Sequence, residues 1–192
     1  MLSSCALSKK WAEERKAEQV KKEAATAVQR PAIQMFDWKG EKVSGPAKVK
    51  ILLHEQKAYI YRGGQEAGWT FLASGTAGHS TPTGNFKVME KIARKSSNTY
   101  GIIVNSSGNV IDWDAKAGRE SVPKGGRFVG APMPYWMRIT ASGVGMHSGP
   151  IPNPGRPASH GCIRLPVEMA AKLFEVVDVG TPVSIIGSAP QS

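Results

Sequence analysis

The feature that most constrains the fold is a change in hydrophobic pattern at Lys48. From there onward the chain consists of short segments rich in β-branched and aromatic residues, which are separated by glycine, serine, asparagine and proline. An alternation with a period of two is typical of strands that bury one face. Many short strands at close spacing predict a mainly β fold, either a β-sandwich or a partly closed barrel. The expected strands lie at 49–55, 57–63, 68–74, 84–92, 100–105, 109–114, 135–140, 143–148 and 181–186.

Two helices are expected outside this pattern. Residues 8–30 are rich in Ala, Glu, Lys, Gln and Arg and contain few large apolar side chains, so they predict a solvated N-terminal helix that ends at Pro31. Residues 166–177 carry Met169 and Leu173 at helical spacing behind a proline in the first turn, which predicts a C-terminal helix packed on the sheet. The expected organisation is an N-terminal anchor, helical spacer and linker over 1–47, a globular domain over 48–187 and a tail over 188–192.

The charge and the cysteine content exclude several classes of protein. The formal net charge is +10, but the basic residues are spread along the chain and no helix-turn-helix, RNP or zinc-finger pattern accompanies them. We therefore expect no nucleic-acid partner, whereas an anionic polymer or a membrane surface fits the charge. Cys5 and Cys162 cannot form a disulfide scaffold or a zinc site with four cysteine ligands. No run reaches the roughly 18 apolar residues of a membrane-spanning helix, which argues against a polytopic membrane protein.

The segment from Leu2 to Cys5, Leu-Ser-Ser-Cys, resembles the bacterial lipobox, in which the cysteine becomes a lipid-modified N-terminus after signal cleavage. The basic and apolar regions of a signal peptide do not precede it in this sequence. Lipidation of Cys5, with attachment to a membrane through the lipid, is therefore one expectation. A free cysteine in a frayed N-terminus is the other.

The residues that carry chemistry lie on one loop-rich stretch, where His147, His160 and Cys162 occur together. A cysteine attacks a carbonyl as the thiolate, and a free thiol with a pKa of about 8.5 is mostly protonated at neutral pH. Either histidine is a candidate to take its proton. If residues 159–163 are extended, the side chains of His160 and Cys162 lie on the same face. Gly161 between them lets the backbone approach a substrate, and backbone N–H groups near Cys162 are candidates for an oxyanion hole.

Residues Ser159 to Arg164 read Ser-His-Gly-Cys-Ile-Arg, and with His147 upstream they resemble the signature of the L,D-transpeptidase family, the YkuD-type catalytic domain. Residues 80–88, STPTGNFKV, resemble the TPTGxF segment of that family, which opens a strand near the site. The sequence LFEVVDVGTPVSI resembles the closing helix and strand of the same family. The resemblance covers roughly 48–187 and implies a catalytic domain there.

The resemblance implies a catalytic role for several matching residues. Cys162 is the implied nucleophile and His147 the implied general base, with the carbonyl of Ser148 or a nearby carbonyl orienting the imidazole. His160 and Gly161 are implied to shape the turn that carries the nucleophile, and the Gly161 and Cys162 amides are implied to face the oxyanion. Ser148 departs from the family pattern, because many relatives have glycine there, and this departure bears on substrate scope.

Substrate binding is the implied role of a second set of residues. The planar guanidinium of Arg164 suits a substrate carboxylate. Tyr135 or Trp136 would form a wall of the substrate groove. The complete set assigned to substrate binding is Arg164, Ser159, Tyr135, Trp136 and His79.

The resemblance also implies a reaction and its partners. Cys162 would attack a peptidoglycan tetrapeptide stem at the carbonyl that precedes the terminal D-alanine, and D-alanine would leave. The thioester would pass to an amine of a second stem, to a wall-attached protein, or to water, which would make the enzyme a carboxypeptidase. No cofactor is implied, and the substrate implies a place in the periplasm or cell envelope.

The residues by themselves also allow two other functions for the protein, and a purely structural role for Cys162. His147, His160 and Cys162 are also a possible ligand set for zinc with an open fourth position, as in a metal-dependent hydrolase, although no H-E-x-x-H or C-x-x-C spacing supports it. A peptidoglycan-binding lipoprotein without turnover is the second function, and a small buried core residue is the inert role for Cys162. Turn or surface positions are expected for His54 and, as the alternative to a place at the site, for His79. Core positions are expected for Trp69, Trp113, Tyr135 and Trp136, with a wall of the substrate groove as the alternative for Tyr135 and Trp136.

Overall fold

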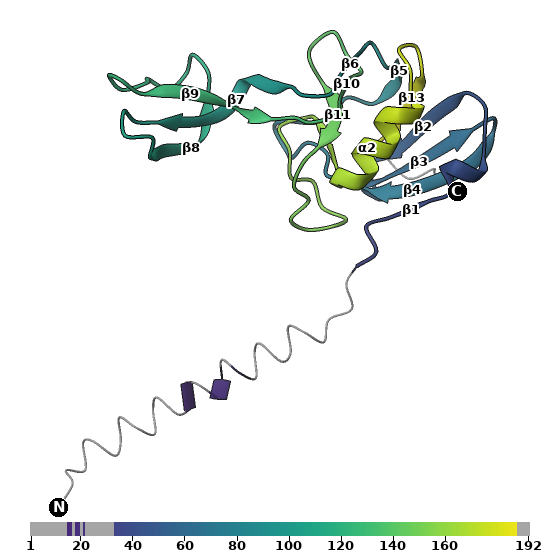
Figure 1. The fold of residues 1–192 in the computed structure, drawn as a ribbon, viewed down its shortest axis with the longest axis horizontal. Helices are drawn as coiled ribbons and strands as arrows, with labels where there is room; N and C mark the ends of the chain where they lie inside the picture. The colour runs from purple at the N-terminus through teal and green to yellow at the C-terminus, as the bar shows by residue number, and fades with distance from the viewer. Residues whose placement is uncertain (1–14, 17, 20, 22–32, 188–192) are drawn as a thin grey trace, which may run out of the picture. The chain divides into compact units, whose positions relative to one another are not determined.

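The computed structural model describes residues 15–16, 18–19, 21 and 33–187, and its contacts divide the chain into two units, Met1–Gln34 and Met35–Ser192 (Figure 1). The described residues of the first unit are exposed, and those at 15–16, 18–19 and 21 are helical. The rest of the expected N-terminal helix, Cys5 and the tail over 188–192 lie outside the described residues. Within the described part, no helix is both long and apolar enough to cross a membrane.

The largest sheet of the second unit has six strands in the order β1-β4-β3-β2-β13-β5. Strands β2 and β13 run parallel, and the other neighbours are antiparallel. The alternating pattern holds in this sheet, because Val49, Ile51 and Ile60 are fully buried while Lys48 is exposed. Its strands are β1 (Phe36–Trp38), β4 (Gln65–Phe71), β3 (Lys57–Arg62), β2 (Ala47–Leu52), β13 (Pro182–Ile186) and β5 (Gly84–Lys87).

A smaller four-stranded sheet and one helix complete the main body. The sheet order is β12-β11-β10-β6, and β11 pairs with β12 in parallel. Met137 and Met146 of this sheet, Met169 and Leu173 of the helix, and Ile51 of the larger sheet belong to one buried cluster. Burial of these side chains holds the two sheets and the helix together. The elements are β12 (Ile163–Leu165), β11 (Gly145–Ser148), β10 (Trp136–Arg138), β6 (Glu90–Ile92) and helix α2 (Val167–Val176).

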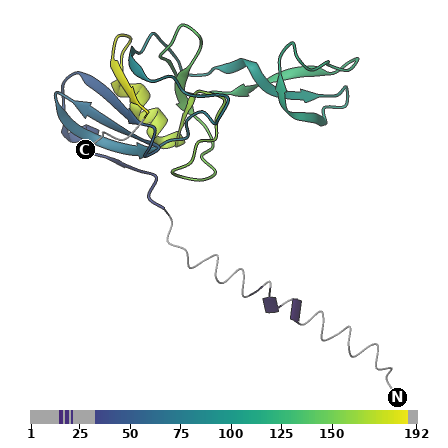
Figure 2. The same cartoon turned by 180° about the vertical axis from the view of Figure 1, so that it is seen from behind.

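A third sheet projects from the main body, on the side away from the six-stranded sheet, in both views (Figures 1 and 2). It has three antiparallel strands in the order β8-β7-β9, and we call residues 96–132 the arm. The chain enters and leaves the arm side by side, because the Met133 amide donates to the Lys95 carbonyl at 2.8 Å and the Tyr135 amide to the Ala93 carbonyl at 2.9 Å. The strands are β8 (Val110–Lys116), β7 (Ser96–Val104) and β9 (Arg127–Pro132).

The mainly β fold with one packed helix is confirmed, and the sheets do not close into a barrel. The expected C-terminal helix is present at Val167–Val176. The strand expected at 84–92 is wrong as one element, because it divides into β5 and β6, which join different sheets. The segment expected as a linker before residue 48 contains β1 and a short 3-10 helix, Gly40–Lys42, and the strands β9 and β12 were not expected.

Candidate active site

Cys162 lies at the end of a tight turn, residues 159–162, that leads directly into β12; we call it the nucleophile turn. Gly161 has a φ of +112°, a conformation that side chains with a Cβ rarely adopt. The Gly161 amide donates to Oγ of Ser159 at 3.1 Å, and that hydroxyl donates to the Cys162 carbonyl. The extended conformation considered for residues 159–163 is not present, because Ser159 is hydrogen-bonded to both Gly161 and Cys162 within one turn.

The nucleophile turn is held from the main body by Thr81, which the sequence did not single out. The Thr81 hydroxyl donates to the Gly161 carbonyl at 2.8 Å and accepts from the Gly75 amide at 2.9 Å. The Ser159 amide donates to the Ser74 carbonyl at 3.0 Å. Thr81 belongs to the TPTG segment, so the two segments that carry the family resemblance meet at this hydroxyl.

A buried glutamine braces the same region and was also missed. Gln56 is 2% exposed, and its amide nitrogen donates to Oγ of Ser74 at 2.8 Å and to the Leu53 carbonyl at 2.7 Å. Its side-chain oxygen accepts from the Ser74 amide at 2.9 Å. A buried amide with these partners fixes the backbone that supports the turn. No local pattern around Gln56 signals this role, because Ser74 is separated from it by strands β3 and β4.

His147 lies on β11 and is only 5% exposed. Its Nδ1 lies 2.7 Å from the Ser148 carbonyl oxygen, which can only accept, so Nδ1 carries the hydrogen and Nε2 presents a lone pair. Burial lowers the pKa of His147 to about 4, and the positive charge of Arg164 acts in the same direction. The imidazole is therefore neutral at neutral pH, which is the form that accepts a proton.

The Cys162 thiol is also in its neutral form at neutral pH. Burial raises its pKa, which the Gly145 amide and the positive charges of Arg164 and Arg138 oppose. The sulfur lies 3.9 Å from the Gly143 carbonyl, to which the thiol donates. A neutral thiol and a neutral imidazole mean that the proton has to move during attack, in contrast to a resting thiolate–imidazolium pair.

Cys162, His147 and Arg164 line one cavity of about 800 Å³. The arm supplies part of the same lining. Arg138 is paired with Glu90 at 3.3 Å, whereas no carboxylate of the described residues lies within ion-pair distance of the half-buried Arg164. The guanidinium of Arg164 is therefore free to bind an anionic group in the cavity.

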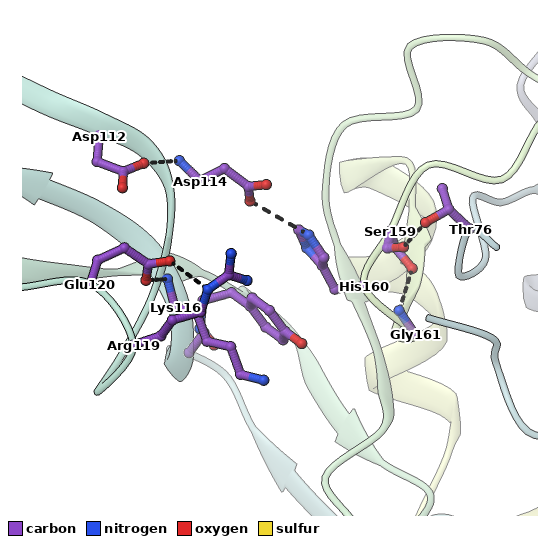
Figure 3. Close-up of polar contacts among 11 residues, drawn as sticks. Thr76, Asp112, Asp114, Lys116, Arg119, Glu120, Ser159, His160 and Gly161 are labelled. Carbon is purple, nitrogen blue, oxygen red and sulfur yellow. Dashed lines mark hydrogen bonds and ion pairs between the residues drawn. The ribbon is translucent and has the colours of Figure 1, made fainter. Parts of the chain in front are cut away.

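His160 lines the same cavity as Cys162, and its ring contacts the arm. Its ring stacks on Tyr100 of the arm. Figure 3 shows the contact of its Nε2 with Asp114, whose carboxylate oxygen lies 3.5 Å away. The exposed His79 meets the His160 ring edge-on. His147, His160 and Cys162 do not form a group that could hold a metal ion within the described residues, so the zinc ligand set is wrong.

The aromatic residues divide between the core, the cavity and the surface. Trp136 is buried and lines the cavity, with its ring 6.1 Å from that of His147. Tyr135 packs on Phe174 and is not part of the cavity lining. Trp113 lines the cavity and is 77% exposed, so its expected place in the core is wrong.

Of the two amides expected to donate to the oxyanion, those of Gly161 and Cys162, one already has a hydrogen-bond partner. The Gly161 amide is already bonded to Ser159, so this amide would have to exchange partners to reach an oxyanion. The Cys162 amide stays the predicted donor. The amide of Ser148 donates to the Pro134 carbonyl at 2.8 Å. The contact between Ser148 and the His147 ring is made by the Ser148 carbonyl.

Comparison with known proteins agrees with the fold and the motifs. The family model for YkuD, the L,D-transpeptidase catalytic domain, matches residues 46–185. L,D-transpeptidase 1 of Mycobacterium tuberculosis is 32% identical over 118 residues, which are 59% of this chain and 39% of that protein. The chain thus spans about two fifths of the length of the curated relatives that it matches.

Two solved structures show the same architecture. An L,D-transpeptidase from Mycobacterium smegmatis superposes with a TM-score of 0.57 at 21% identity, over 74% of this chain and 59% of that one. The Ldtfm–avibactam carbamoyl enzyme superposes with a TM-score of 0.54 at 28% identity, over 75% of this chain and 50% of that one. Since the family model covers most of the sequence, including the nucleophile turn and His147, this chain belongs to the L,D-transpeptidase (YkuD) catalytic-domain family.

Proposed function

We propose that this protein is a cysteine-dependent L,D-transpeptidase that acts on peptidoglycan stem peptides. The observation that carries the proposal is the state of His147, whose Nδ1–H is fixed on the Ser148 carbonyl while burial keeps the ring neutral. His147 and Cys162 line the same cavity. A neutral imidazole that shares a cavity with a neutral thiol is suited to general-base activation of a nucleophile.

In the first step, Cys162 Sγ attacks the carbonyl carbon that precedes the terminal D-alanine of a tetrapeptide stem. His147 Nε2 takes the thiol proton as the S–C bond forms, and the Cys162 amide donates to the developing oxyanion. The C–N bond then breaks, and His147 returns the proton to the leaving nitrogen of D-alanine. The product is a thioester between Cys162 and the shortened stem.

In the second step, an acceptor amine attacks the thioester carbonyl and His147 takes a proton from that amine. The C–S bond breaks, and the proton returns to Cys162. An amine of a second stem gives a crosslink, and an amine of a wall-attached protein gives an attachment. Water in the same place gives a shortened stem and an L,D-carboxypeptidase activity.

The cavity suits an anionic, extended peptide. Lys95, Arg138 and Arg164 line it together with the single carboxylate of Asp114, and among the described residues only Arg138 of these three cations is paired with a carboxylate, that of Glu90. We assign Arg164 to a carboxylate of the stem, with Ser159 and Trp136 as further lining residues. The substrate places the reaction in the periplasm or cell envelope, and a lipid on Cys5 would hold the enzyme at the membrane.

The test is turnover of a purified tetrapeptide stem, followed by mass spectrometry. We expect loss of the terminal D-alanine, with a crosslinked dimer when a second stem supplies the amine and a tripeptide when only water is present. The reaction should continue in the presence of a metal chelator. Binding of stems or of intact peptidoglycan without any release of D-alanine would instead identify a non-catalytic wall-binding protein.

The pKa of His147 makes a prediction for the pH profile. The imidazole accepts a proton only above its pKa of about 4, so kcat/KM for the stem should hold as the pH falls from 7 and decline only near pH 4. The raised pKa of Cys162 predicts that alkylation of the free enzyme by iodoacetamide still rises above about pH 8.5. An acid limb near pH 6.5, the ordinary histidine value, would contradict the neutral buried imidazole.

A further inference from the structure

The arm reaches the nucleophile turn through a set of contacts around His160 (Figure 3). Tyr100 of β7 stacks on the imidazole with ring centroids 4.3 Å apart and an interplanar angle of 7°. Asp114 of β8 lies 3.5 Å from His160 Nε2. His79, from the main body, meets the His160 ring edge-on with centroids 4.9 Å apart and an angle of 86°, and its ring centroid lies 6.3 Å from that of Tyr100. The His160 ring therefore contacts two arm residues and one body residue.

The arm has few other attachments over the cavity. In the described sheets, its strands β7, β8 and β9 hydrogen-bond only with one another. Its buried residues Ile103, Val104 and Ala115 do not belong to the buried cluster of the main body. The arm is joined to the body where its two ends meet, and Figure 1 shows it extending away from that junction. Its position over the cavity therefore depends strongly on the contacts at His160.

The arm matters for the reaction because it forms one wall of the cavity. Ile102, Trp113 and Val129 of the arm belong to the lining, together with residues of the main body such as His147. His160 precedes Cys162 by two residues, and the turn between them is fixed to the body by Thr81. A contact that holds the arm on His160 therefore also sets the distance between this wall and the nucleophile.

We propose that Tyr100, Asp114 and His160 form a clasp that positions the arm as the substrate-facing wall of the cavity. His160 is in this view a positioning residue, since its ring is engaged with the arm and its Nε2 with Asp114. The Asp114 side chain is 77% exposed, so the stacked Tyr100 carries the larger share of the contact. The clasp proposal rests on the proposed function for its role in substrate binding. Of its two tests, only the kinetic one requires that the protein act on stem peptides.

The kinetic test compares variants in the full chain on the stem peptide. Tyr100→Ala should raise KM about three- to tenfold, the range expected for one lost aromatic pair, while kcat stays within about twofold. Tyr100→Phe keeps the stack and should restore KM. His160→Ala should raise KM as well, and the double variant should be no worse than the worse single variant, because both remove one contact. The control is Arg127→Ala on the exposed part of β9, outside the cavity lining.

Three kinetic results would overturn the clasp. They are an unchanged KM in Tyr100→Ala, a Tyr100→Phe variant as impaired as Tyr100→Ala, and single effects that multiply in the double variant. A small neutral reagent separates positioning from general damage. Iodoacetamide should alkylate Cys162 at rates within about twofold in wild type and Tyr100→Ala, because it does not need the wall. A parallel loss of alkylation and turnover would assign the effect to a distorted site instead.

Amide hydrogen exchange tests the clasp without any substrate, so it stands even if stem turnover fails. Residues 96–104 should exchange faster in Tyr100→Ala and in His160→Ala than in wild type, while Arg127→Ala should leave that segment unchanged. Unchanged exchange of 96–104 in Tyr100→Ala would overturn the clasp whatever the enzyme's substrate. Absence of stem turnover with faster exchange would overturn only the proposed function.

Discussion

The Cys162→Ala variant is expected to lose stem-peptide turnover by about 10⁴-fold or more, because no other group in the cavity can form the thioester. Cys162 stands at the end of the nucleophile turn and is the only free cysteine among the described residues. The fold should survive the substitution, since the turn is held by Ser159 and Thr81 and not by the sulfur. Turnover and the thermal midpoint of the same preparation give the two readouts.

A covalent probe makes the same prediction independent of the natural substrate. Avibactam carbamoylates the relative Ldtfm, and we expect one adduct on wild type by intact-mass spectrometry and none on Cys162→Ala. Chelator should not change the result. An adduct that persists on Cys162→Ala, or turnover that survives this substitution, would remove Cys162 from the nucleophile role. If well-folded wild type releases D-alanine but forms no adduct, the protein does not react with avibactam, and the nucleophile role of Cys162 is then judged from the turnover of Cys162→Ala.

The His147→Ala variant is expected to lose about 10²–10⁴-fold in kcat/KM at pH 7, the usual contribution of a general base. The reason is that the thiol, whose pKa is raised by burial, cannot ionise readily without a neighbouring acceptor. His54→Ala is the matched control, because His54 lies in the turn between β2 and β3 and not in the cavity lining. The control should retain the wild-type rate.

The pH dependence distinguishes a lost base from a damaged site in His147→Ala. As the pH rises, the thiol ionises without a base, so the ratio of the wild-type alkylation rate to the variant rate should fall toward one. A ratio that stays constant from pH 7 to alkaline pH would mean that the substitution disturbs the site instead of removing a base. A variant with wild-type turnover at pH 7 would exclude His147 as the base.

The sequence indicated which residues would lie in the cavity better than it indicated their arrangement. The cavity brings together Cys162, His147 and Arg164, all named from the motif. Tyr135, for which both a core position and a cavity wall were open, packs on Phe174 against the core, and Trp113, expected in the core, is exposed on the arm. Neighbouring positions in sequence do not reveal which face of an irregular strand meets the core, and the bulged pairing of β7 with β8 makes the face of Trp113 unpredictable from alternation.

The supports of the site were missed for a different reason. Thr81 bonds to the carbonyl of Gly161, and Gln56 to Ser74, across long stretches of chain. A single threonine or glutamine carries no local signal for such a bond, since the partner is chosen by the order and register of the strands. The clasp has the same origin, because Asp114 and His160 are 46 residues apart in sequence and meet only in the folded structure.

The sequence alone determined the mainly β class, the packed C-terminal helix and the family, because period-two alternation, helical spacing and a contiguous motif are local properties of the chain. Tertiary structure decided the direction of the nucleophile turn at Gly161, the neutral state of His147 and the contact of the arm with His160. Each of these depends on burial or on residues brought together from distant strands. Such effects arise only when the strands are ordered and packed, so no segment read by itself contains them.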